Sequence, residues 1–517
     1  MMMTIVLAIA IVLALFRFRY LHSRSTALQH LRGPSSPSIL LGQELELRAQ
    51  PTVGGLEKSW QQIYGNTFRI GGCFAQDVLM TSDPKAIQHI LRNSGYRYPK
   101  TKDVAHMWEA AVGRGLLTTS GSVHQRQRKI LSPAFSPSQL KEYMSVFRAT
   151  GAKLCGKFHE LVNQGPQEID LLEWMNHTAL DITGLTSFRC QFGALDGGSC
   201  EMADVTKLLS TAIAKMVPTP IAILVPALWR VLPGWVLSIL DKVPNRENEI
   251  LQQFRVIAQK TARQTIRNVA RDDHSKDIVT LLARASDENL MDEDEILSQL
   301  ATFTLGGEDT VGSLLSWILY ELSRRPDYQA RVREEIRQGS ANYDSTPLLN
   351  AAVNESLRLH PIVHTFSRYA AEDDTIPLSE TVRTRTGETW NEIPVEKGQI
   401  VMISAYTYNR LTAIWGDDAD DWVPERFLNV PKAKGSFSVG LHANLLNFSD
   451  GVHGCIGWKY GLLEVHAILV KLLQSFEFLK SDVELSNGIA LISLIPVVKG
   501  REHEGEQVPV LVKALTS

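Results

Sequence analysis

The chain has 517 residues, of which 44% are hydrophobic and 21% are charged. This is the composition of a globular protein with a large core, so global disorder is excluded. The formal net charge of −3 gives no indication of a nucleic-acid-binding protein. Five scattered cysteines without a Cys-x-x-Cys pair argue against a disulfide framework and against a structural zinc site.

The N-terminus carries an apolar segment. Residues 1–16 are apolar apart from one threonine, and three arginines follow before residue 25. Because positively charged flanks stay on the cytosolic side of a membrane, this order places the rest of the chain in the cytosol. A cleaved signal peptide is the alternative, but its positive charges normally precede its apolar run. The sequence therefore predicts a single-pass transmembrane anchor over residues 1–21.

The remainder divides into a short connection and one large domain. Residues 22–38 are basic and contain a Gly-Pro-Ser-Ser-Pro stretch, which is typical of a stiff hinge. No internal repeat and no long low-complexity linker follows. Residues 39–517 are therefore expected to form a single domain.

Helical spacing of apolar residues dominates this domain. Pro326 should end one helix, and Asp327 is expected to cap the next, which runs to about Arg337. The predicted fold class is mainly α with a small β region. The expected helices are Gln139–Asn163, Glu247–Arg271, Asp292–Arg324 and Thr346–Arg358, and the expected strands are Thr67–Ile70, Val78–Thr81, Ile400–Ser404 and Val508–Val512.

The stretch Met216–Leu240 is strongly apolar and contains four prolines. Proline removes a backbone donor and clashes with the preceding turn, so a regular transmembrane helix is excluded here. Two interpretations stay open. The stretch is either a buried part of the core or a surface patch that dips into the membrane that holds the anchor.

The strongest chemical signal is the loop at residues 448–457, which reads Phe-Ser-Asp-Gly-Val-His-Gly-Cys-Ile-Gly. Its glycines permit tight turns and close approach to a flat ligand. A helical pattern starts at Trp458, so Cys455 is expected to gain thiolate character from a helix N-terminus. A thiolate is the ligand that helps a haem iron to split an O–O bond. The alternative is that Cys455 is a small buried hydrophobic residue.

This loop resembles the haem-binding loop of the cytochrome P450 superfamily, which runs Phe-x-x-Gly-x-Arg-x-Cys-x-Gly. The resemblance implies that Cys455 is the metal ligand of heme b and that Phe448 and Gly457 contact the cofactor. The chain departs from the pattern at His453, where an arginine normally pairs with a haem propionate. His453 is expected to keep a hydrogen bond to the haem, with a charge that depends on pH.

Two further motifs resemble the residues that, in this family, stabilise the region behind the haem. Glu355 and Arg358 lie three residues apart, so they share a helix face. Arg426 lies in a Pro-x-Arg-Phe segment like that of the family. The resemblance implies a buried triad of Glu355, Arg358 and Arg426 with a structural role. By themselves, Glu355 and Arg358 would indicate an ordinary surface ion pair.

The segment Gly-Gly-Glu-Asp-Thr at residues 306–310 lies inside a long helical pattern. Two mid-helix glycines indicate a kink, a tight helix crossing or space for a ligand. The segment resembles the oxygen-activation motif of the family's long helix. The resemblance implies that Asp309 and Thr310 are the catalytic residues that organise proton delivery. Glu308 occupies the variable position of the motif and is assigned no role.

Three further basic residues resemble the family's propionate-binding positions. His124 and Arg128 lie four apart and share a helix face, and Arg368 follows in Thr-Phe-Ser-Arg-Tyr. A solvated basic helix is the alternative for the first two. Arg126 and Lys129 should point elsewhere and form a local basic patch for an acidic electron donor.

The resemblance spans residues 35–515 and implies a membrane-anchored oxidoreductase, a monooxygenase (EC 1.14.-.-) that inserts one oxygen atom of O2 into an apolar small molecule. Hydroxylation or epoxidation of a terpenoid or other secondary metabolite is the preferred interpretation, by analogy with fungal members. Electrons should come from a separate NADPH-cytochrome P450 reductase, with cytochrome b5 as a second donor. The expected location is the endoplasmic reticulum membrane, with the catalytic domain in the cytosol.

Two other functions are alternatives to a monooxygenase. A haem-thiolate isomerase or dehydratase would need neither O2 nor NADPH, but such members tend to lose the acid–threonine pair that this chain keeps. A non-catalytic haem sensor lacks support because no signalling or DNA-binding module is evident. The family layout places the substrate pocket among the loop Val104–Leu117, the helix Ala301–Thr310, the segment Ile362–Phe366 and the turn near Ile489–Leu494.

Overall fold

The computed structural model describes residues 27–197, 201–214, 218–233, 235–237, 246–269, 275–339, 342–428, 438–490 and 493–515. The expected anchor at residues 1–21 lies outside them. Within these ranges, no helix is long and apolar enough to cross a membrane. The described part of the expected hinge packs onto the body of the protein, where Leu28 and Leu31 are both 1% exposed.

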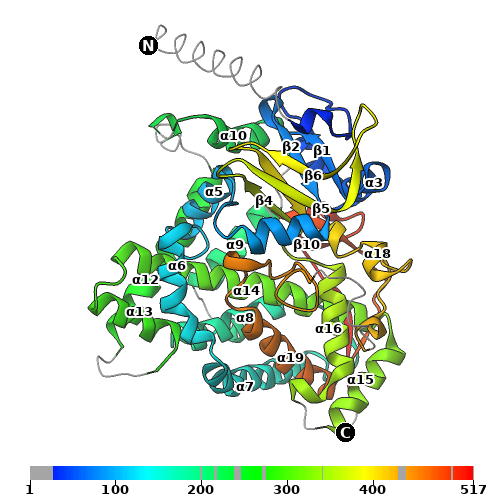
Figure 1. The fold of residues 1–517 in the computed structure, drawn as a ribbon. Coiled ribbons are helices and arrows are strands. Elements are labelled where there is room, and N and C mark those ends of the chain that lie inside the picture. The colour runs from blue at the N-terminus through cyan, green and yellow to red at the C-terminus, as the bar shows by residue number, and fades with distance from the viewer. Residues whose placement is uncertain are drawn as a thin grey trace.

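Helices form most of the molecule, and strands are gathered mainly on one side (Figure 1). The helices of the N-terminal half are α2 (Glu44–Ala49), α3 (Gly55–Tyr64), α4 (Pro84–Gln88), α5 (Lys102–Val112), α6 (Gly121–Leu131), α7 (Pro137–Leu161), α8 (Leu171–Ser187), α9 (Glu201–Ala214), α10 (Pro220–Val231) and α12 (Arg246–Arg267). Those of the C-terminal half are α13 (Ile278–Asp287), α14 (Glu293–Ser323), α15 (Pro326–Gln338), α16 (Pro347–Leu359), α17 (Ala405–Tyr408), α18 (Thr412–Trp415) and α19 (Trp458–Ser475).

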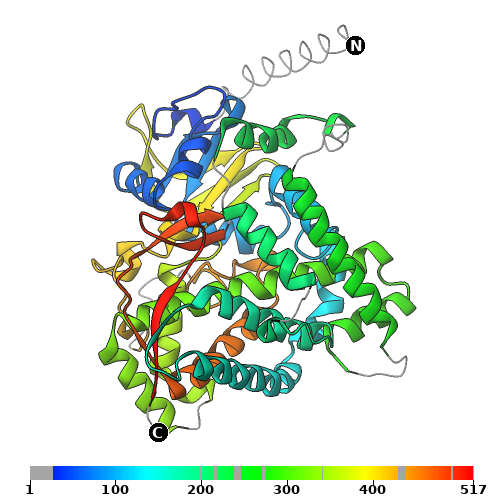
Figure 2. The same cartoon turned by 180° about the vertical axis from the view of Figure 1, so that it is seen from behind.

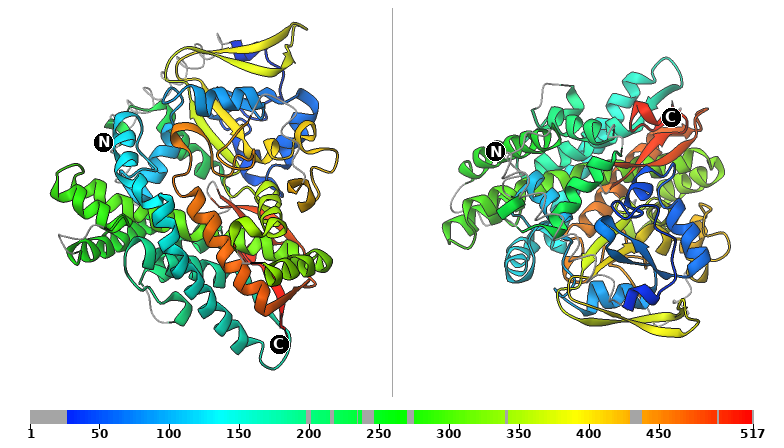
Figure 3. Two further views of the ribbon diagram at one scale, coloured as in Figure 1. Left: turned by 60° about the horizontal axis from the view of Figure 1, so that its bottom comes forward. Right: turned by 90° about the horizontal axis from the view of Figure 1, so that it is seen from above.

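The strands form four small sheets. The largest has the order β1-β2-β7-β4, and the others are β3-β11-β8, β5-β6 and β9-β10. The β5–β6 hairpin stands at the edge of the molecule (Figure 3). The strands are β1 (Thr67–Gly71), β2 (Asp77–Thr81), β3 (Gln167–Asp170), β4 (Thr365–Tyr369), β5 (Asp374–Arg383), β6 (Thr389–Val395), β7 (Ile400–Ser404), β8 (Phe476–Leu479), β9 (Leu485–Ala490), β10 (Ser493–Val498) and β11 (Pro509–Ala514). The predicted fold class, mainly α with a small β region in one large domain, is therefore confirmed.

The long helix α14 runs through the centre of the molecule and organises the core (Figure 1). Its 31 residues span about 46 Å. The helix begins with a capping box, in which Asp292 accepts a bond from the Glu295 amide while the Glu295 side chain bonds back to the Asp292 amide. Near its middle, a Cβ at Gly312 would lie 1.8 Å from Asn176 Oδ1 of α8. A glycine is therefore required for α14 and α8 to pack this closely.

Two local predictions differ from the structure. Asp327 does not cap α15; Arg325 occupies the N-cap position and Pro326 the first turn, where its missing N–H costs nothing. The segment predicted as the loop Val104–Leu117 is largely helix α5, which runs between Thr101 and Gly113. The wrong assignment arose because the apolar residues of this helix face a cavity as well as the core.

Helix α10 lies within the stretch Met216–Leu240, and the predicted packing in the core holds for one face of this helix. One face packs inward, with Ile223 8% exposed and Ala227 1% exposed, whereas Ile221 is 73% exposed. The helix is tied down by Arg230, whose guanidinium lies 2.6 Å from carboxylate oxygens of both Asp103 in α5 and Glu44 in α2. Burial disfavours the charge of Arg230, but the two carboxylates raise its pKa above the usual value.

Candidate active site

The Cys455 loop is held by backbone geometry that only glycine tolerates. Gly451 has φ of +61°, and a Cβ there would lie 1.9 Å from the Leu91 carbonyl oxygen. The Cys455 amide donates to the Phe448 carbonyl at 2.8 Å, so the loop folds back on itself before α19 begins at Trp458. This arrangement directs the cysteine toward an interior cavity.

The thiol of Cys455 faces that cavity. Burial raises its pKa, while the Gly457 amide and the charge of Arg128 act in the opposite direction. Both of these contacts favour the expected thiolate character, and a coordinated metal ion would complete it, because a metal deprotonates a bound thiol outright.

Basic side chains converge beside this loop from three parts of the chain. His124 and Arg128 come from α6, Arg368 from β4, and His453 from the loop itself, and all four line the cavity with Lys100. Arg128 Nη1 donates to the Gly454 carbonyl at 2.7 Å, and Arg368 Nη1 donates to the Ser367 carbonyl at 3.0 Å. The structure therefore brings the four predicted residues together and adds a fifth.

Among the described residues, no carboxylate acts on Lys100, Arg128 or Arg368; only the Cys455 thiol and the Tyr96 phenol oppose the effect of burial on Arg128. Burial lowers the pKa of Lys100 to about 7 and that of Arg368 to about 10, and no carboxylate in the described chain opposes either shift. Burial lowers the pKa of His453 to about 2, so this side chain stays neutral and its charge does not follow physiological pH. Neither of its ring nitrogens has a hydrogen-bond partner among the described residues.

These observations fit a flat cofactor that bears two carboxylates and a metal. The unopposed cations suit carboxylates, and the unpaired His453 nitrogens suit a hydrogen bond to one of them. Cys455 supplies a sulfur on the same cavity wall. On α14, a Cβ at Gly306 would meet nothing within 4 Å, which leaves space beside a planar group. Haem meets each of these requirements.

The acid–threonine pair lies on the α14 wall of the same cavity. The Thr310 hydroxyl donates to the Gly306 carbonyl at 2.7 Å, so that carbonyl is engaged by a side chain. Burial raises the pKa of Asp309 to about 6. The neighbouring Glu308 is only 8% exposed, and it also lines the cavity.

The cavity has a volume of about 660 Å³, which is within the range of small-molecule sites. Three of the expected segments line it, namely α5 with the residues after it, the middle of α14, and the segment 362–366. From the expected turn, Ser493 contributes whereas Leu494 packs in the core, and residues 491–492 lie outside the described chain. The apolar lining includes Val104, Trp108, Leu116, Leu117, Phe303, Leu305, Ile362 and Phe366.

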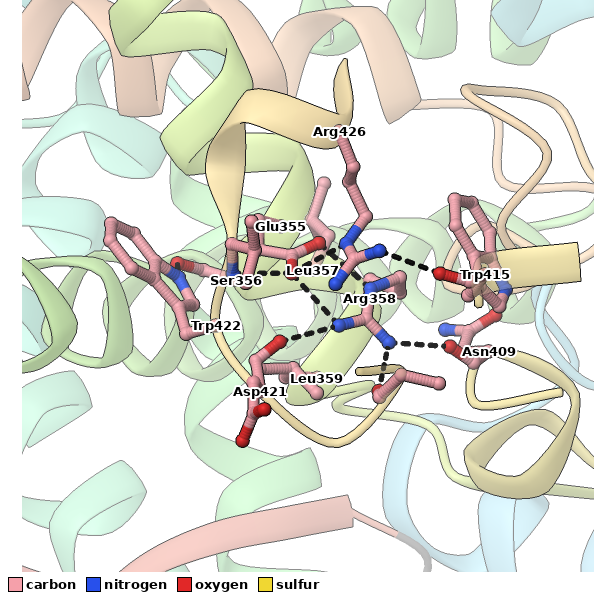
Figure 4. Close-up of polar contacts among 12 residues, drawn as sticks. Glu355, Ser356, Leu357, Arg358, Leu359, Asn409, Trp415, Asp421, Trp422 and Arg426 are labelled. Atoms are coloured by element: carbon pink, nitrogen blue, oxygen red, sulfur yellow. Dashed lines mark hydrogen bonds and ion pairs between the residues drawn. The ribbon is translucent and has the colours of Figure 1, made fainter. Parts of the chain in front are cut away.

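Behind this region lies a buried ionic cluster (Figure 4). Arg358 donates to both carboxylate oxygens of Glu355, at 2.7 and 2.8 Å, and both side chains are fully buried. Arg426 Nε donates to Glu355 Oε1 at 2.9 Å. The remaining Arg358 donors bind the carbonyls of Asn409, Ala419 and Asp421. The three residues thus join α16 to the long segment before the Cys455 loop.

Two residues in the site were missed by the sequence analysis. Lys100 is a lone lysine after a proline, and only its backbone pairing with Arg368 brings it to the cavity. Glu308 was set aside because the motif leaves its position open. A third residue is placed differently from expectation: Arg126 lies 2.6 Å from Glu295, so its charge is already paired.

Comparisons with known proteins agree with this geometry. The family model for cytochrome P450 matches residues 32–494. Cytochrome P450 monooxygenase claO of Ampulloclitocybe clavipes is 33% identical, with 93% of each chain covered. Its claP counterpart from the same fungus is 32% identical, covering 93% of this chain and 92% of its own. Cytochrome P450 monooxygenase 91 of Postia placenta is 31% identical, covering 83% and 84%.

The match extends over most of the chain and includes the cysteine loop, the long helix and the buried ionic cluster. Proteins of this family bind haem through a thiolate and receive their electrons from a reductase. The protein belongs to the cytochrome P450 family of haem-thiolate monooxygenases.

Proposed function

We propose that the chain holds heme b through Cys455 and oxidises an apolar small molecule bound in the same cavity. The observation that carries this proposal is the cavity wall itself, which joins the Cys455 sulfur, the five basic side chains beside it, and the Asp309–Thr310 pair. When bound, thiolate-ligated haem supplies the activation of O2. The protein supplies the binding, the orientation and the protons.

Each basic residue has a distinct part in holding the cofactor. Arg128 and Arg368 are planar and permanently charged, so they suit the propionate carboxylates. His124 is fixed by its Nδ1 contact to the Tyr96 hydroxyl at 2.8 Å, which leaves Nε2 for the cofactor. His453 contributes a neutral hydrogen bond, and Lys100 supplies the positive charge that an arginine at position 453 would carry. Phe448 and Gly457, which line the cavity beside Cys455, would contact the porphyrin ring.

Asp309 and Thr310 handle protons on the α14 wall of the cavity. At neutral pH most Asp309 side chains are ionised, because the pKa is about 6, so the carboxylate can accept a proton and return it. The Thr310 hydroxyl lies one helical turn from Gly306 and can pass that proton into the cavity. Retention of this pair favours monooxygenation over an isomerase or dehydratase reaction, which needs neither O2 nor NADPH.

The substrate is proposed to be a terpenoid or a similar secondary metabolite. The cavity lining is mostly apolar and aromatic, which suits a hydrocarbon skeleton with few polar groups. Electrons come from a separate NADPH-cytochrome P450 reductase, or from cytochrome b5 as a second donor. Lys129, exposed on α6, offers a positive charge to such an acidic partner.

The protein is proposed to be held in the endoplasmic reticulum membrane by residues 1–21, with the catalytic domain in the cytosol. The apolar run followed by arginines supports this orientation. Helix α10 supports it further, because its outer face exposes Ile221 and Val225 while its inner face packs with Leu41. An apolar face of this kind suits the edge of a bilayer.

The experiment that tests the haem assignment compares the reduced, carbon monoxide-bound spectra of the native protein and Cys455→Ala. The native protein should show the red-shifted Soret band of a thiolate-ligated haem, and Cys455→Ala should lose it. Cys155→Ala is the matched control, because Cys155 is buried in the core away from the cavity, and this variant should keep the band. A native protein that is folded and haem-loaded but lacks the band would refute the thiolate assignment.

A further inference from the structure

Three arginines surround an open hollow beside the turn of the β5–β6 hairpin, separate from the cavity that Cys455 lines. Arg32 lies just after the short helical turn η2 (Ala27–His30), Arg383 ends β5, and Arg385 lies in the turn that follows. All three side chains are exposed. The three are referred to here as the arginine cluster. The other described residues around the hollow are uncharged: Thr384, Thr386 and Gly387.

The two segments that carry the arginine cluster are joined by their backbones. Leu31 and Thr384, each 1% exposed, form an antiparallel bridge. The Arg385 amide donates to the His30 carbonyl at 2.8 Å, and Arg385 Nε donates to the Leu31 carbonyl at 3.0 Å. The fold itself therefore brings the arginines together, and no ligand is needed to assemble the cluster.

The positive charge of the arginine cluster is not neutralised by the fold. Among the described residues, none of its guanidinium groups forms an ion pair with a carboxylate. Glu388, in the same turn, is bound through its backbone carbonyl, which accepts from the Thr384 amide at 2.8 Å. Positive charges around one hollow repel one another, and a bound anion would remove that repulsion. The planar fork of a guanidinium group matches the oxygens of a phosphate in particular.

The place of the arginine cluster in the chain and in the fold favours a membrane lipid as the source of this phosphate. Only residues 22–26 separate the proposed anchor from η2, so η2 begins within about 20 Å of the membrane even if these residues are fully extended. The outer face of α10, with Ile221 and Val225, lies in the same upper half of the molecule as the hairpin, as two opposite views show (Figure 1, Figure 2). A bilayer that contacts α10 therefore also lies on the side of the cluster.

We propose that the arginine cluster binds the phosphate of an anionic phospholipid headgroup on the cytosolic face of the membrane. The sequence supplies further arginines at positions 17, 19 and 24, and basic clusters beside a membrane segment are typical of anionic-lipid binding. The segment that follows Arg32 exposes Ile39 (61%) and Leu40 (44%), which would contact the acyl chains of the lipid. This inference rests on the proposed membrane anchor and is independent of the haem assignment.

The test titrates the full chain, held in neutral detergent micelles, with dihexanoyl phosphatidylserine and measures the heat of binding. Binding should be at least about tenfold tighter than that of dihexanoyl phosphatidylcholine, whose choline neutralises the phosphate charge. It should also exceed that of inorganic phosphate, which has no acyl chains. Arg32→Gln and Arg383→Gln should each weaken the binding of phosphatidylserine about fivefold, the contribution of one basic residue near an anionic surface. Arg385 is kept because its Nε holds the Leu31 carbonyl.

Two matched controls separate the arginine cluster from net charge. Arg383→Lys keeps the charge and should retain most of the affinity for phosphatidylserine. Arg337 is 78% exposed in its pair with Glu334, and α15 lies at the opposite end of the molecule from the hairpin (Figure 1). Arg337→Gln should therefore bind the lipid as the native chain does. An equal loss in Arg337→Gln and Arg383→Gln would show that net charge attracts the lipid, and would overturn the proposal. Equal affinities for inorganic phosphate and phosphatidylserine would assign the cluster to a free phosphate instead.

The outcomes also separate this inference from the proposed anchor. After reconstitution, the full chain should float with vesicles of phosphatidylcholine alone, because an apolar segment inserts without an anionic headgroup. Failure to float would refute the anchor on which the inference rests. A chain that floats but binds phosphatidylserine and phosphatidylcholine equally would refute the headgroup site alone. If the double variant of Arg32→Gln and Arg383→Gln keeps its affinity for phosphatidylserine and loses affinity for the reductase, the cluster is a protein contact and the proposal is wrong.

Discussion

At the scale of single residues, the buried cluster of Glu355, Arg358 and Arg426 limits which substitutions the fold tolerates. Every donor of Arg358 is used, and its side chain is fully buried. A buried ion pair adds little net stability over an apolar substitute, but removal of one partner leaves a buried charge unpaired. The cluster therefore makes the fold intolerant of single changes at these positions.

Arg358→Met is expected to lower the free energy of unfolding by about 3–5 kcal/mol, because Glu355 would lose two of its hydrogen bonds inside the core. Urea unfolding of the haem-loaded protein measures this. Arg337→Ala is the matched control, since Arg337 is 78% exposed in its pair with Glu334. The control should change stability by less than about 1 kcal/mol. Equal effects of the two substitutions would contradict the assignment of a buried cluster.

Part of the active site could be predicted from the sequence, residue by residue. The positions of His124, Arg128, Arg368 and Cys455 on one cavity followed from motifs, because each motif fixes its residue on a local element. The contribution of Lys100 could not be predicted, because it depends on pairing between segments that are 268 positions apart in the chain. The burial of Glu308 was equally hidden, because α9 and the segment after β10 together enclose it.

At the scale of elements, α10 has one buried and one exposed apolar face, whereas the sequence analysis treated burial in the core and exposure at a surface as alternatives. Its inner face packs against the N-terminal elements, while its outer face exposes Ile221 and Val225. Pro226 lies inside the helix, which at 12 residues spans about 18 Å and is too short to cross a bilayer. Apolar composition alone could not distinguish the buried face from the exposed face, since both faces consist of the same residue types.

Ile221→Asp is expected to reduce binding to phosphatidylcholine vesicles at least about tenfold in a chain that starts at residue 27. Insertion of an isoleucine side chain is worth about 1.5 kcal/mol or more, and an inserted aspartate would oppose binding. Co-sedimentation with the vesicles measures the effect. Leu161→Asp is the control: Leu161 is 43% exposed, and α7 lies at the opposite end of the molecule from α10 (Figure 1). Unchanged binding of Ile221→Asp would exclude α10 from the membrane contact.

At the scale of the whole molecule, buried neutral histidines make stability depend on pH. Burial, with a smaller effect of Arg148, lowers the pKa of His466 to about 4, against about 6.5 in an unfolded chain. The unfolded state therefore binds more protons than the folded state between these two values. Stability is unaffected above about pH 6.5 and is lost as the pH falls from there toward about 4.

His466→Gln should remove up to about 3 kcal/mol of this acid-induced loss, which corresponds to the difference between the two pKa values. The free energy of unfolding, measured in urea near neutral pH and near pH 4.5, gives the comparison. His503→Gln, at an exposed position, should retain the native pH dependence. A pH dependence for His466→Gln that matches the native protein would refute the role of His466.

The fold class was predictable from the sequence because α14, α7 and α16 have long, regular apolar spacing. Helix α5 was not, because its apolar face borders a cavity and its span is short. The order of the strands was also beyond the sequence, since β2 pairs in parallel with β7 across more than 300 residues. Such distant pairings depend on the helices that bring them together.

The ion pairs of Arg230 with Asp103 and Glu44 have a consequence for directed evolution of this enzyme. A library that varies the cavity face of α5 would change Val104, Trp108 and Ala111, and would leave Asp103 beside them fixed. If Asp103 were varied as well, Arg230 would lose its partner in α5, and the recovered clones would differ in the attachment of α10 as much as in substrate range. If Asp103, Glu44 and Arg230 are all kept, the screen reports substrate selectivity separately from the structural integrity of the enzyme.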